Sequence, residues 1–559
     1  MSTAFEFKTP IGKSIFYQKY ALTQADTWPE RCRTVVDDVC GTMAGRRRRT
    51  LSEPECTYLT KVMTEMKFLP GGRYLYYGGR SAHYFNNCFM LRAEEDTREE
   101  WASLVQRSTS CLMVGGGIGI DYSRIRPKGR TIKKTGGVAS GPLSLMYMMN
   151  EIGRHVMQGG SRRSAIYASL NWKHEDAKEL LIAKDWSRMQ VGGGGGLTLA
   201  DIKRHDFNFN APLDMTNISL NYDDEFLKSC KTGTLPKTFI QNVRGALQHG
   251  EPGFSFNFGD KQNETLRNAC TELTSEDDSD VCNLGSVNMG SIETLEEFRE
   301  IVKVASKFLI CGTLRADLPY EKVKEVREKN RRIGLGLMGI HEWLLKRGYS
   351  YEMNDELRSW LQVYKEESEV SANEHCDRLY LNRPAGYRAI APTGTIGILA
   401  GTTTGIEPLY AVAYKRRYLV GGDTWKYEYV VDSTAELLIK EYGLSPDKIE
   451  TAVDLAKDPE RRIAFQADVQ DYVDHAISST INLPPWGTEF NNEGRVVEYA
   501  TLLHKYAPRL RGFTCYPDGS RGGQPLTTVP YEEARGQIGI VFSEHDICSI
   551  SGKGGTCGS

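Results

Sequence analysis

Short apolar segments that alternate with longer helical segments limit the folds open to this chain. The strand-like segments are A-I-Y-A-S-L near residue 165, N-I-S-L near 217, G-F-S-F near 253 and Y-R-A-I near 387. Helices are expected at 24–43, 52–67, 96–113, 141–157, 174–184 and 354–379. Strands interleaved with helices favour an α/β fold that contains parallel strands.

Composition excludes several classes of protein. Hydrophobic residues make up 40% of the 559 residues and charged residues 25%, so a disordered, collagen-like or coiled-coil protein is excluded. The net charge of −2 argues against non-specific nucleic-acid binding. No apolar run approaches the ~18 residues that span a bilayer, and the N-terminus lacks the apolar core of a signal peptide. We expect no membrane association and a cytoplasmic location, in a bacterium or in a host cell if the source is viral.

The cysteines do not form a disulfide framework. There are 13, an odd number, and no C-x-x-C pair occurs among them. Zinc-ribbon and thioredoxin-like sites therefore lose their main support. Most of these thiols are expected to be reduced core residues, and the question is which few are redox-active.

One glycine motif matches a dinucleotide-binding fingerprint. Gly334–Gly339 matches G-x-G-x-x-G, which would indicate a nicotinamide-dependent oxidoreductase. The residues before it, E-K-N-R-R-I, are charged, whereas the fingerprint requires a hydrophobic strand there. Close packing of a helix against these glycines is the favoured interpretation.

Asn268, Cys270 and Glu272 place an amide, a thiol and a carboxylate on alternating positions of N-A-C-T-E. In an extended segment these positions share one face, so three functional groups are expected to project into one space. Cys282 follows twelve residues after Cys270, and Cys88 lies far upstream in F-N-N-C-F.

A second segment has the character of an anion site. A-P-T-G-T-I follows the strand-like Y-R-A-I, so hydroxyls and free amides are expected at a turn that starts a helix. The residues that would bind phosphate are Thr393, Gly394, Thr395 and Ile396. An ordinary strand-to-helix turn is the alternative interpretation.

These segments, in this order, resemble the ribonucleotide reductases. The resemblance runs from about Pro70 to Pro484, and G-F-T-C-Y-P-D-G-S-R resembles the family's last barrel segment. The matching segments include P-G-G-R-Y-L, F-N-N-C-F, G-G-G-I-G-I, Q-G-G-S-R-R-S-A, N-I-S-L, N-A-C-T-E, C-N-L-G-S-V-N, N-R-R-I-G-L-G-L-M-G, A-P-T-G-T-I and V-D-H-A-I-S-S-T-I-N-L-P.

The resemblance implies a fold and a reaction. The fold is a ten-stranded α/β barrel of two antiparallel five-stranded parallel halves, with a finger loop that carries Cys270 through its centre. We expect an N-terminal helical region at 1–70, the barrel at 71–530, and a C-terminal segment with a flexible redox-active tail at 531–559. The reaction replaces the 2′-hydroxyl of a ribonucleoside di- or triphosphate by hydrogen.

The resemblance also implies a role for each site residue. A thiyl radical at Cys270 abstracts the 3′ hydrogen, Glu272 takes the 3′-hydroxyl proton as general base, and Asn268 orients the sugar. Cys88 and Cys282 supply two electrons and two protons and end as a disulfide.

Two further cysteines, Cys548 and Cys557, lie in the Gly/Ser-rich C-terminal segment. They are expected to re-reduce the active-site disulfide by thiol–disulfide exchange and to be reduced in turn by a thioredoxin-like protein. A partial metal site with His545 is the alternative.

The expected radical source is adenosylcobalamin. Partner-dependent members of the family relay the radical from a ferritin-like metal subunit through paired tyrosines, whereas this chain has Cys515-Tyr516-Pro517 at the matching place. The short N-terminus and the P-G-G-R opening resemble the class II enzymes, which bind adenosylcobalamin without a protein histidine. The cobalt then lies within the cofactor, and no metal ligand from the protein is expected. A partner-dependent reductase remains the alternative.

Regulation is also implied by the resemblance. A dNTP or ATP effector would bind where two subunits of a homodimer meet, because the insertion that replaces the second subunit in monomeric members is absent between Asp121 and Arg130. The residues assigned to the effector and specificity loops are Glu95, Asp96, Lys133, Gln158, Arg162 and Arg163. No N-terminal ATP-cone is expected.

A non-catalytic nucleotide-binding protein on the same scaffold is a further alternative.

Overall fold

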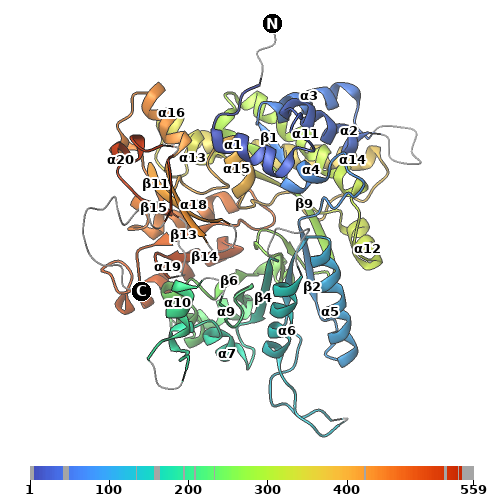
Figure 1. Cartoon of the computed structure of the whole chain (residues 1–559). Coiled ribbons are helices and arrows are strands. Elements are labelled where there is room, and N and C mark those ends of the chain that lie inside the picture. The colour runs from blue at the N-terminus through green and yellow to red at the C-terminus, as the bar shows by residue number, and fades with distance from the viewer. Residues whose placement is uncertain are drawn as a thin grey trace.

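The computed structural model shows an α/β barrel with helices packed around it (Figure 1). It describes residues 5–41, 50–133, 135–156, 164–192, 196–206, 209–231, 233–420, 424–520, 526–538 and 540–543. In Figure 1 one half of the barrel lies in the lower part of the molecule, and the N-terminal helices lie above it.

Five consecutive parallel strands form the first half of the barrel. They are β2 (Cys88–Arg92), β3 (Gly117–Asp121), β4 (Ile166–Asn171), β5 (Thr216–Tyr222) and β6 (Gly253–Phe256). The helices that connect them include α5 (Arg98–Met113), α6 (Pro142–His155), α7 (Ala177–Ile182) and α10 (Lys237–His249). Nearly every residue of these strands is buried, as expected for parallel strands covered by helices.

The second half is also parallel, and single bridges complete it. Strand β9 (Asp280–Asn288) pairs with β10 (Ile333–Met338), and β13 (Thr480–Leu483) pairs with β14 (Gly512–Pro517). Between them, Leu335 bridges Arg388 and Ile390 bridges Ile477. The strand-like Y-R-A-I segment is therefore the middle of the five strands of this half; each of the ten strand positions of the barrel is called a stave below. Its helices include α11 (Leu295–Arg315), α12 (Glu321–Asn330), α14 (Asp355–Arg378), α18 (Pro459–Gln470) and α19 (Val496–Tyr506).

The two halves meet antiparallel at both seams. β2 pairs with β9 at one seam, and β6 pairs with β14 at the other. The ring of ten staves is therefore closed, which confirms the predicted barrel of two antiparallel five-stranded halves. Closure leaves no free sheet edge inside the ring, and it places Cys88 of β2 directly opposite Cys282 of β9.

Gly334 and Gly336 lie within β10, and Gly339 alone forms the turn to α13 (Ile340–Lys346). A Cβ at Gly336 would lie 2.6 Å from the carbonyl oxygen of Ala389, so the glycine allows two neighbouring staves to approach closely. The predicted packing of a helix against these glycines is therefore wrong. The fingerprint places its first glycines in the turn after a strand, so the nicotinamide interpretation loses its basis.

The N-terminal residues pack on the second half of the barrel. Helices α1 (Pro10–Ile15), α2 (Trp28–Cys40), α3 (Glu53–Thr64) and α4 (Gly72–Tyr77) surround β1 (Phe68–Pro70), which pairs antiparallel with β9. Capping boxes begin α2 at Thr27 and α3 at Ser52, as the sequence predicts for Ser52. These helices share one apolar cluster with α11 and α14.

A separate four-stranded antiparallel sheet contains the end of the described chain. Its order is β15 (Leu526–Thr528), β11 (Ala413–Val420), β12 (Thr424–Val431) and β16 (Val541–Ser543). Helix α20 (Tyr531–Arg535) contacts β12, and in Figure 1 this sheet lies on the side of the molecule away from α5 and α6. The domain boundary expected at residue 530 falls within this sheet and stays a prediction.

In the part of the chain that the structure describes, no helix combines the length and the apolar character needed to cross a bilayer.

Candidate active site

A short hairpin carries Cys270 into the barrel. Its strands are β7 (Leu266–Arg267) and β8 (Thr274–Ser275), and Leu266 and Leu273 pack in one apolar cluster with Cys88, Met90 and Cys282 of β2 and β9. Because the neighbours of these last residues along each strand pack in the outer core, the cluster lies on the inner face of the barrel. The hairpin is therefore the predicted finger loop.

The tip of the hairpin is a tight turn. The amide of Thr271 donates to the carbonyl of Asn268 at 3.0 Å, and Thr271 adopts a left-handed backbone with φ of 68°. The expected extended segment, with three side chains on one face, is therefore wrong. Reversal of the chain leaves Cys270 exposed at the tip and buries Asn268 and Glu272 on either side of it.

Two glycines of β3 make room for this hairpin. A Cβ at Gly119 would lie 1.8 Å from the carbonyl oxygen of Arg267, and one at Gly117 would lie 2.9 Å from the Cβ of Ala269. A side chain at either position would collide with the finger loop. The G-I-G-I pattern is thus a strand whose inner face is cleared for a second piece of backbone.

Two buried thiols face each other beside the tip. Cys88 and Cys282 are cross-strand partners in β2 and β9, and both are free thiols. The Nδ2 group of Asn268 donates to the sulfur of Cys88 at 3.0 Å, and the Oδ1 atom of Asn268 accepts from the amide of Leu273 at 3.0 Å. Burial raises the pKa of both thiols well above the ordinary value, so both hold their protons at neutral pH.

Glu272 has the character of a general base near neutral pH. Burial raises its pKa from 4.5 to about 7, and the hydrogen bond from Asn268 acts in the opposite direction. Its Oε2 atom is buried and has no hydrogen-bond partner within the described ranges. A carboxyl group that titrates near 7 and has a spare acceptor is suited to exchange a proton with a substrate hydroxyl.

The structure brings together five of the residues that the sequence singled out. Burial raises the pKa of Cys88 most, and Glu272, Cys270 and Cys282 raise it further when they are ionised, so the three groups lie near this thiol. Asn268 contacts Cys88 directly. An exposed thiol, a carboxyl group with a raised pKa, a buried amide and a pair of facing thiols therefore share one site.

The segment at 393–396 begins a helix directly after a barrel stave. Helix α15 (Gly394–Ala400) follows Thr393, whose backbone is left-handed with φ of 49° and whose hydroxyl accepts from the amide of Gly405 at 2.8 Å. Amides in the first turn of a helix have no acceptor within the helix, so those of Gly394, Thr395 and Ile396 can bind a ligand. A phosphate site at this turn stays a prediction.

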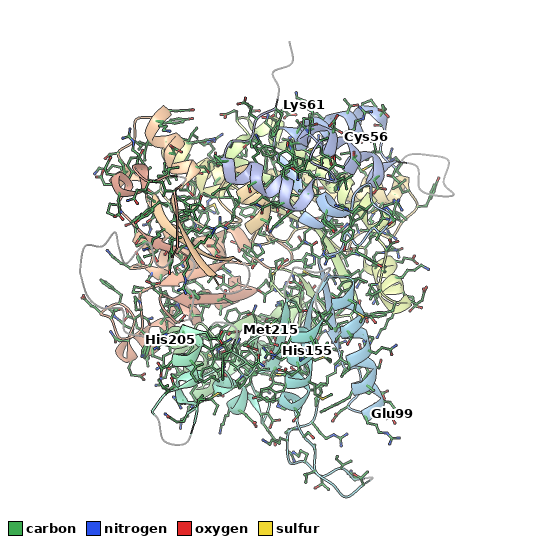
Figure 2. All side chains as sticks on the ribbon, viewed as in Figure 1. Cys56, Lys61, Glu99, His155, His205 and Met215 are labelled. Carbon is green, nitrogen blue, oxygen red and sulfur yellow. The ribbon has the colours of Figure 1, made fainter. Side chains whose placement is uncertain are left out.

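Two of the residues assigned to the effector site, Glu95 and Asp96, directly precede α5. The backbone amide of Arg126 donates to the carboxylate of Asp96 at 3.0 Å, and its guanidinium ion-pairs with the same group. Glu95 and Lys133 are exposed. Figure 2 labels Glu99 in the first turn of α5, at the outer end of that helix, and His155 at the end of α6, nearer the middle of the molecule.

Several predicted residues cannot be placed. Gln158, Arg162 and Arg163 lie outside the described residues, and so do Cys548, Cys557 and His545.

A set of buried charged residues at the base of the hairpin was missed by the sequence analysis. Arg267 is 1% exposed and Glu264 is 9% exposed, although both are charged. The available signal was a charged residue, Arg267, directly before Asn268 in an otherwise uncharged T-L-R-N-A-C run.

Comparison with known proteins identifies related chains. A family model described as "Ribonucleotide reductase, barrel domain" matches residues 86–248, 243–366 and 383–507. The chain is 26% identical over 547 residues to a vitamin B12-dependent ribonucleoside-diphosphate reductase of Mycobacterium tuberculosis, covering 86% of this chain and 75% of the relative. It is 24% identical to a putative adenosylcobalamin-dependent ribonucleoside-triphosphate reductase of Mycobacterium phage D29, covering 94% and 96%.

Two solved structures share the fold. One is a B12-dependent (class II) ribonucleotide reductase, with a TM-score of 0.70 and 16% identity over 96% of this chain and 94% of that one. The other is the alpha subunit of a class Id ribonucleotide reductase from Actinobacillus ureae, with a TM-score of 0.70 and 16% identity over 93% and 99%. Because the two scores are equal, the fold alone does not distinguish between the two classes.

Proposed function

This chain belongs to the ribonucleotide reductase family, and from that membership we propose that it reduces ribonucleotides to 2′-deoxyribonucleotides with adenosylcobalamin as its radical source. One observation carries the proposal. The hairpin inside the barrel holds the thiol of Cys270 next to a basic carboxylate and a pair of facing thiols. These are the groups that a thiyl-radical reduction of ribose needs.

The site accommodates a radical source that acts directly on Cys270. Among the eleven cysteines that the structure describes, Cys270 is the exposed one, so its side chain is accessible to a bound group. Where a radical relay has paired tyrosines, β14 has Cys515 beside Tyr516. Cys515 is buried and donates to the carbonyl of Ala246. The relatives are named vitamin B12- or adenosylcobalamin-dependent. Bound adenosylcobalamin would supply the radical chemistry that Cys270 needs.

The residues of the chain divide the work of the reaction. The thiyl radical of Cys270 removes the 3′ hydrogen of the ribose, and Glu272 takes the proton of the 3′-hydroxyl. The amide of Asn268 orients the sugar beside the dithiol. With a pKa of about 7, Glu272 is ionised in about half of the molecules at neutral pH, so it can both accept and return a proton.

Cys88 and Cys282 balance the reduction. The substrate loses its 2′-hydroxyl as water and gains one hydrogen, while the two thiols lose two hydrogens and become a disulfide. Directly opposed residues of antiparallel strands have Cα atoms about 4.5–5.5 Å apart, within the range that a disulfide spans. The bond can therefore form with little movement of β2 and β9.

We assign the re-reduction of this disulfide to Cys548 and Cys557, with a thioredoxin-like protein as the external reductant. They follow Ser543, the last residue of β16, by five and fourteen residues. Strand β16 is held in place by its pairing with β12. Because five extended residues span at most about 17 Å, Cys548 can lie no farther than that from Ser543.

Substrate phosphates are assigned to the amides at the start of α15 and to the hydroxyls of Thr393 and Thr395. The assignment rests on the position of this turn at the end of a parallel stave, where ligands of α/β proteins commonly bind. The substrate is a ribonucleoside di- or triphosphate.

We assign the enzyme to a homodimer that forms through α5 and α6. Met113, Tyr147 and Met148 are large apolar side chains with 68%, 38% and 51% exposure on these two helices, which contact each other. Exposed apolar residues grouped on neighbouring helices are typical of an interface. A nucleotide effector would bind beside Glu95, Asp96 and Lys133, and the protein would act in the cytoplasm.

An activity assay tests the proposal. Purified protein is given each NDP and each NTP with a small dithiol, with and without adenosylcobalamin and a dNTP effector. We expect deoxynucleotides only when the cofactor is present. Activity with an iron or manganese subunit, and none with adenosylcobalamin, would place the chain in the partner-dependent class.

A further inference from the structure

We propose that Glu264, Thr274 and Arg511 form a clamp that holds the Cys270 hairpin at its reactive position. These are positioning residues, because they contact the base of the hairpin and not the reacting sulfur. The inference rests on the proposed function. It adds one requirement: the base of the hairpin must be held in place so that the thiol of Cys270 at its tip stays at a fixed position in the barrel.

The centre of the clamp is one carboxylate. The hydroxyl of Thr274 donates to Oε2 of Glu264 at 2.6 Å, and Nη2 of Arg511 donates to the same oxygen at 2.9 Å. Lys261 donates to Oε1 at 2.9 Å. Glu264 lies just before β7, Thr274 begins β8, and Arg511 directly precedes β14. A single side chain therefore ties both ends of the hairpin to a barrel strand of the second half.

A second set of bonds holds the first strand of the hairpin. Arg267, on β7, donates to Oδ1 of Asn257 at 2.7 Å and to the carbonyl of Arg511 at 3.1 Å. The hydroxyl of Thr265 donates to Oδ2 of Asp121, at the end of β3, at 2.6 Å. The start of the hairpin is thus fixed to β3, β6 and β14 together.

The segment before β13 supports the other strand. The amide of Thr274 donates to Nδ1 of His475 at 3.4 Å, and the amide of Ala476 donates to the carbonyl of Glu272 at 2.8 Å. Arg511 also donates to the carbonyl of Asp474 at 3.3 Å. Arg511 therefore links this segment to Glu264 and, through Glu264, to Thr274.

Burial makes these bonds strong and their loss severe. Thr274 is fully buried. Burial acts to raise the pKa of Glu264, but Arg511, Lys261 and Thr274 together lower it below the ordinary value, which keeps this carboxylate charged. Loss of one partner leaves this buried carboxylate with one hydrogen bond fewer, and water does not readily replace it. The backbone of β3 approaches the hairpin closely at Gly119, so β3 supports one side of the hairpin and the clamp holds its base.

A conservative substitution at Thr274 tests the clamp. T274V removes the hydroxyl and keeps the shape, and T274S restores the hydroxyl. The matched control is T216V, because Thr216 is equally buried and its hydroxyl donates to Oδ1 of Asn150 at 3.0 Å, away from the hairpin. Amide hydrogen exchange of residues 266–275 and the kcat and KM for ribonucleotide reduction are measured in all four proteins.

In T274V we expect exchange in residues 266–275 to quicken about tenfold and kcat to fall about tenfold, with KM changed by less than about twofold. T274S and T216V should match the wild type in both measurements. R511K, which keeps the charge and loses the forked donor geometry, provides a second variant and should behave like T274V.

Unchanged exchange and kcat in T274V and R511K would overturn the clamp, and so would an equal effect of T216V. Hydrogen exchange does not need turnover. If the wild type formed no deoxynucleotide while T274V still quickened exchange in the hairpin, the clamp would stand and the proposed function would fail.

Discussion

Replacement of Glu272 by glutamine is expected to abolish catalysis and to stabilise the folded protein at alkaline pH. The carboxylate has a raised pKa because it is buried, and its Oε2 atom has no hydrogen-bond partner among the described residues. The folded state therefore tolerates the proton and disfavours the charge. Glutamine has nearly the same shape and carries no charge, so E272Q removes this penalty together with the base.

The size of the effect follows from the pKa. The folded value is about 7 and the ordinary value is 4.5. Each tenfold change in the ionisation equilibrium corresponds to about 1.4 kcal/mol, so the charge destabilises the folded state by up to about 3 kcal/mol. The sign follows from proton binding. Between pH 4.5 and 7 the folded state binds more protons than the unfolded state, so wild-type stability falls as the pH rises through this window and is level above it.

Urea unfolding, followed by the fluorescence of the 8 tryptophans, measures the difference at several pH values. E272Q and wild type should be equally stable at pH 4.5, to within about 0.5 kcal/mol, and E272Q should be more stable by about 2–3 kcal/mol at pH 8. The control is E342Q. Glu342 is equally buried, but it accepts from Thr402 at 2.6 Å and pairs with Lys346 at 2.8 Å, so its replacement should destabilise the protein. A pH-independent difference for E272Q would refute the reasoning.

Three further substitutions have distinct expected results. C88S should block multiple turnovers with a small dithiol and with thioredoxin alike, because no disulfide can form with Cys282; sustained turnover in a product assay would contradict this. C548S should keep turnover with the small dithiol and lose most of it with thioredoxin, and equal loss with both reductants would show that the tail is assigned wrongly. G119A should reduce turnover at least about a hundredfold, because its Cβ would lie 1.8 Å from the carbonyl of Arg267; kcat near the wild-type value would show that the hairpin can shift freely.

The elements of the barrel were largely predictable from local pattern. Ser52 and Thr97 cap helices that begin one residue later, and the apolar segments near 165, 217 and 253 are the strands β4, β5 and β6. Local pattern could not show which strands are neighbours. The antiparallel seam between β2 and β9 joins residues about 190 apart, and no periodicity carries that information.

The chemistry of the site was more predictable than its geometry. The residue types of N-A-C-T-E indicate the reacting groups, but their alternation predicts an extended strand. The left-handed backbone of Thr271 reverses the chain instead, because the turn is fixed by contacts at both ends of the hairpin. Those contacts join residues such as Glu264 and Arg511, which lie almost 250 positions apart, so no local pattern can predict the pairing.

The central claim is that the sulfur of Cys270 becomes a radical during turnover. Rapid-freeze electron paramagnetic resonance of the enzyme mixed with adenosylcobalamin, substrate and effector tests it, with protein labelled by cysteine deuterated at Cβ. We predict a sulfur-centred radical whose signal narrows on deuteration and is absent in C270S. The same signal in C270S, or deoxynucleotide formation by C270S at the wild-type rate, would contradict the account.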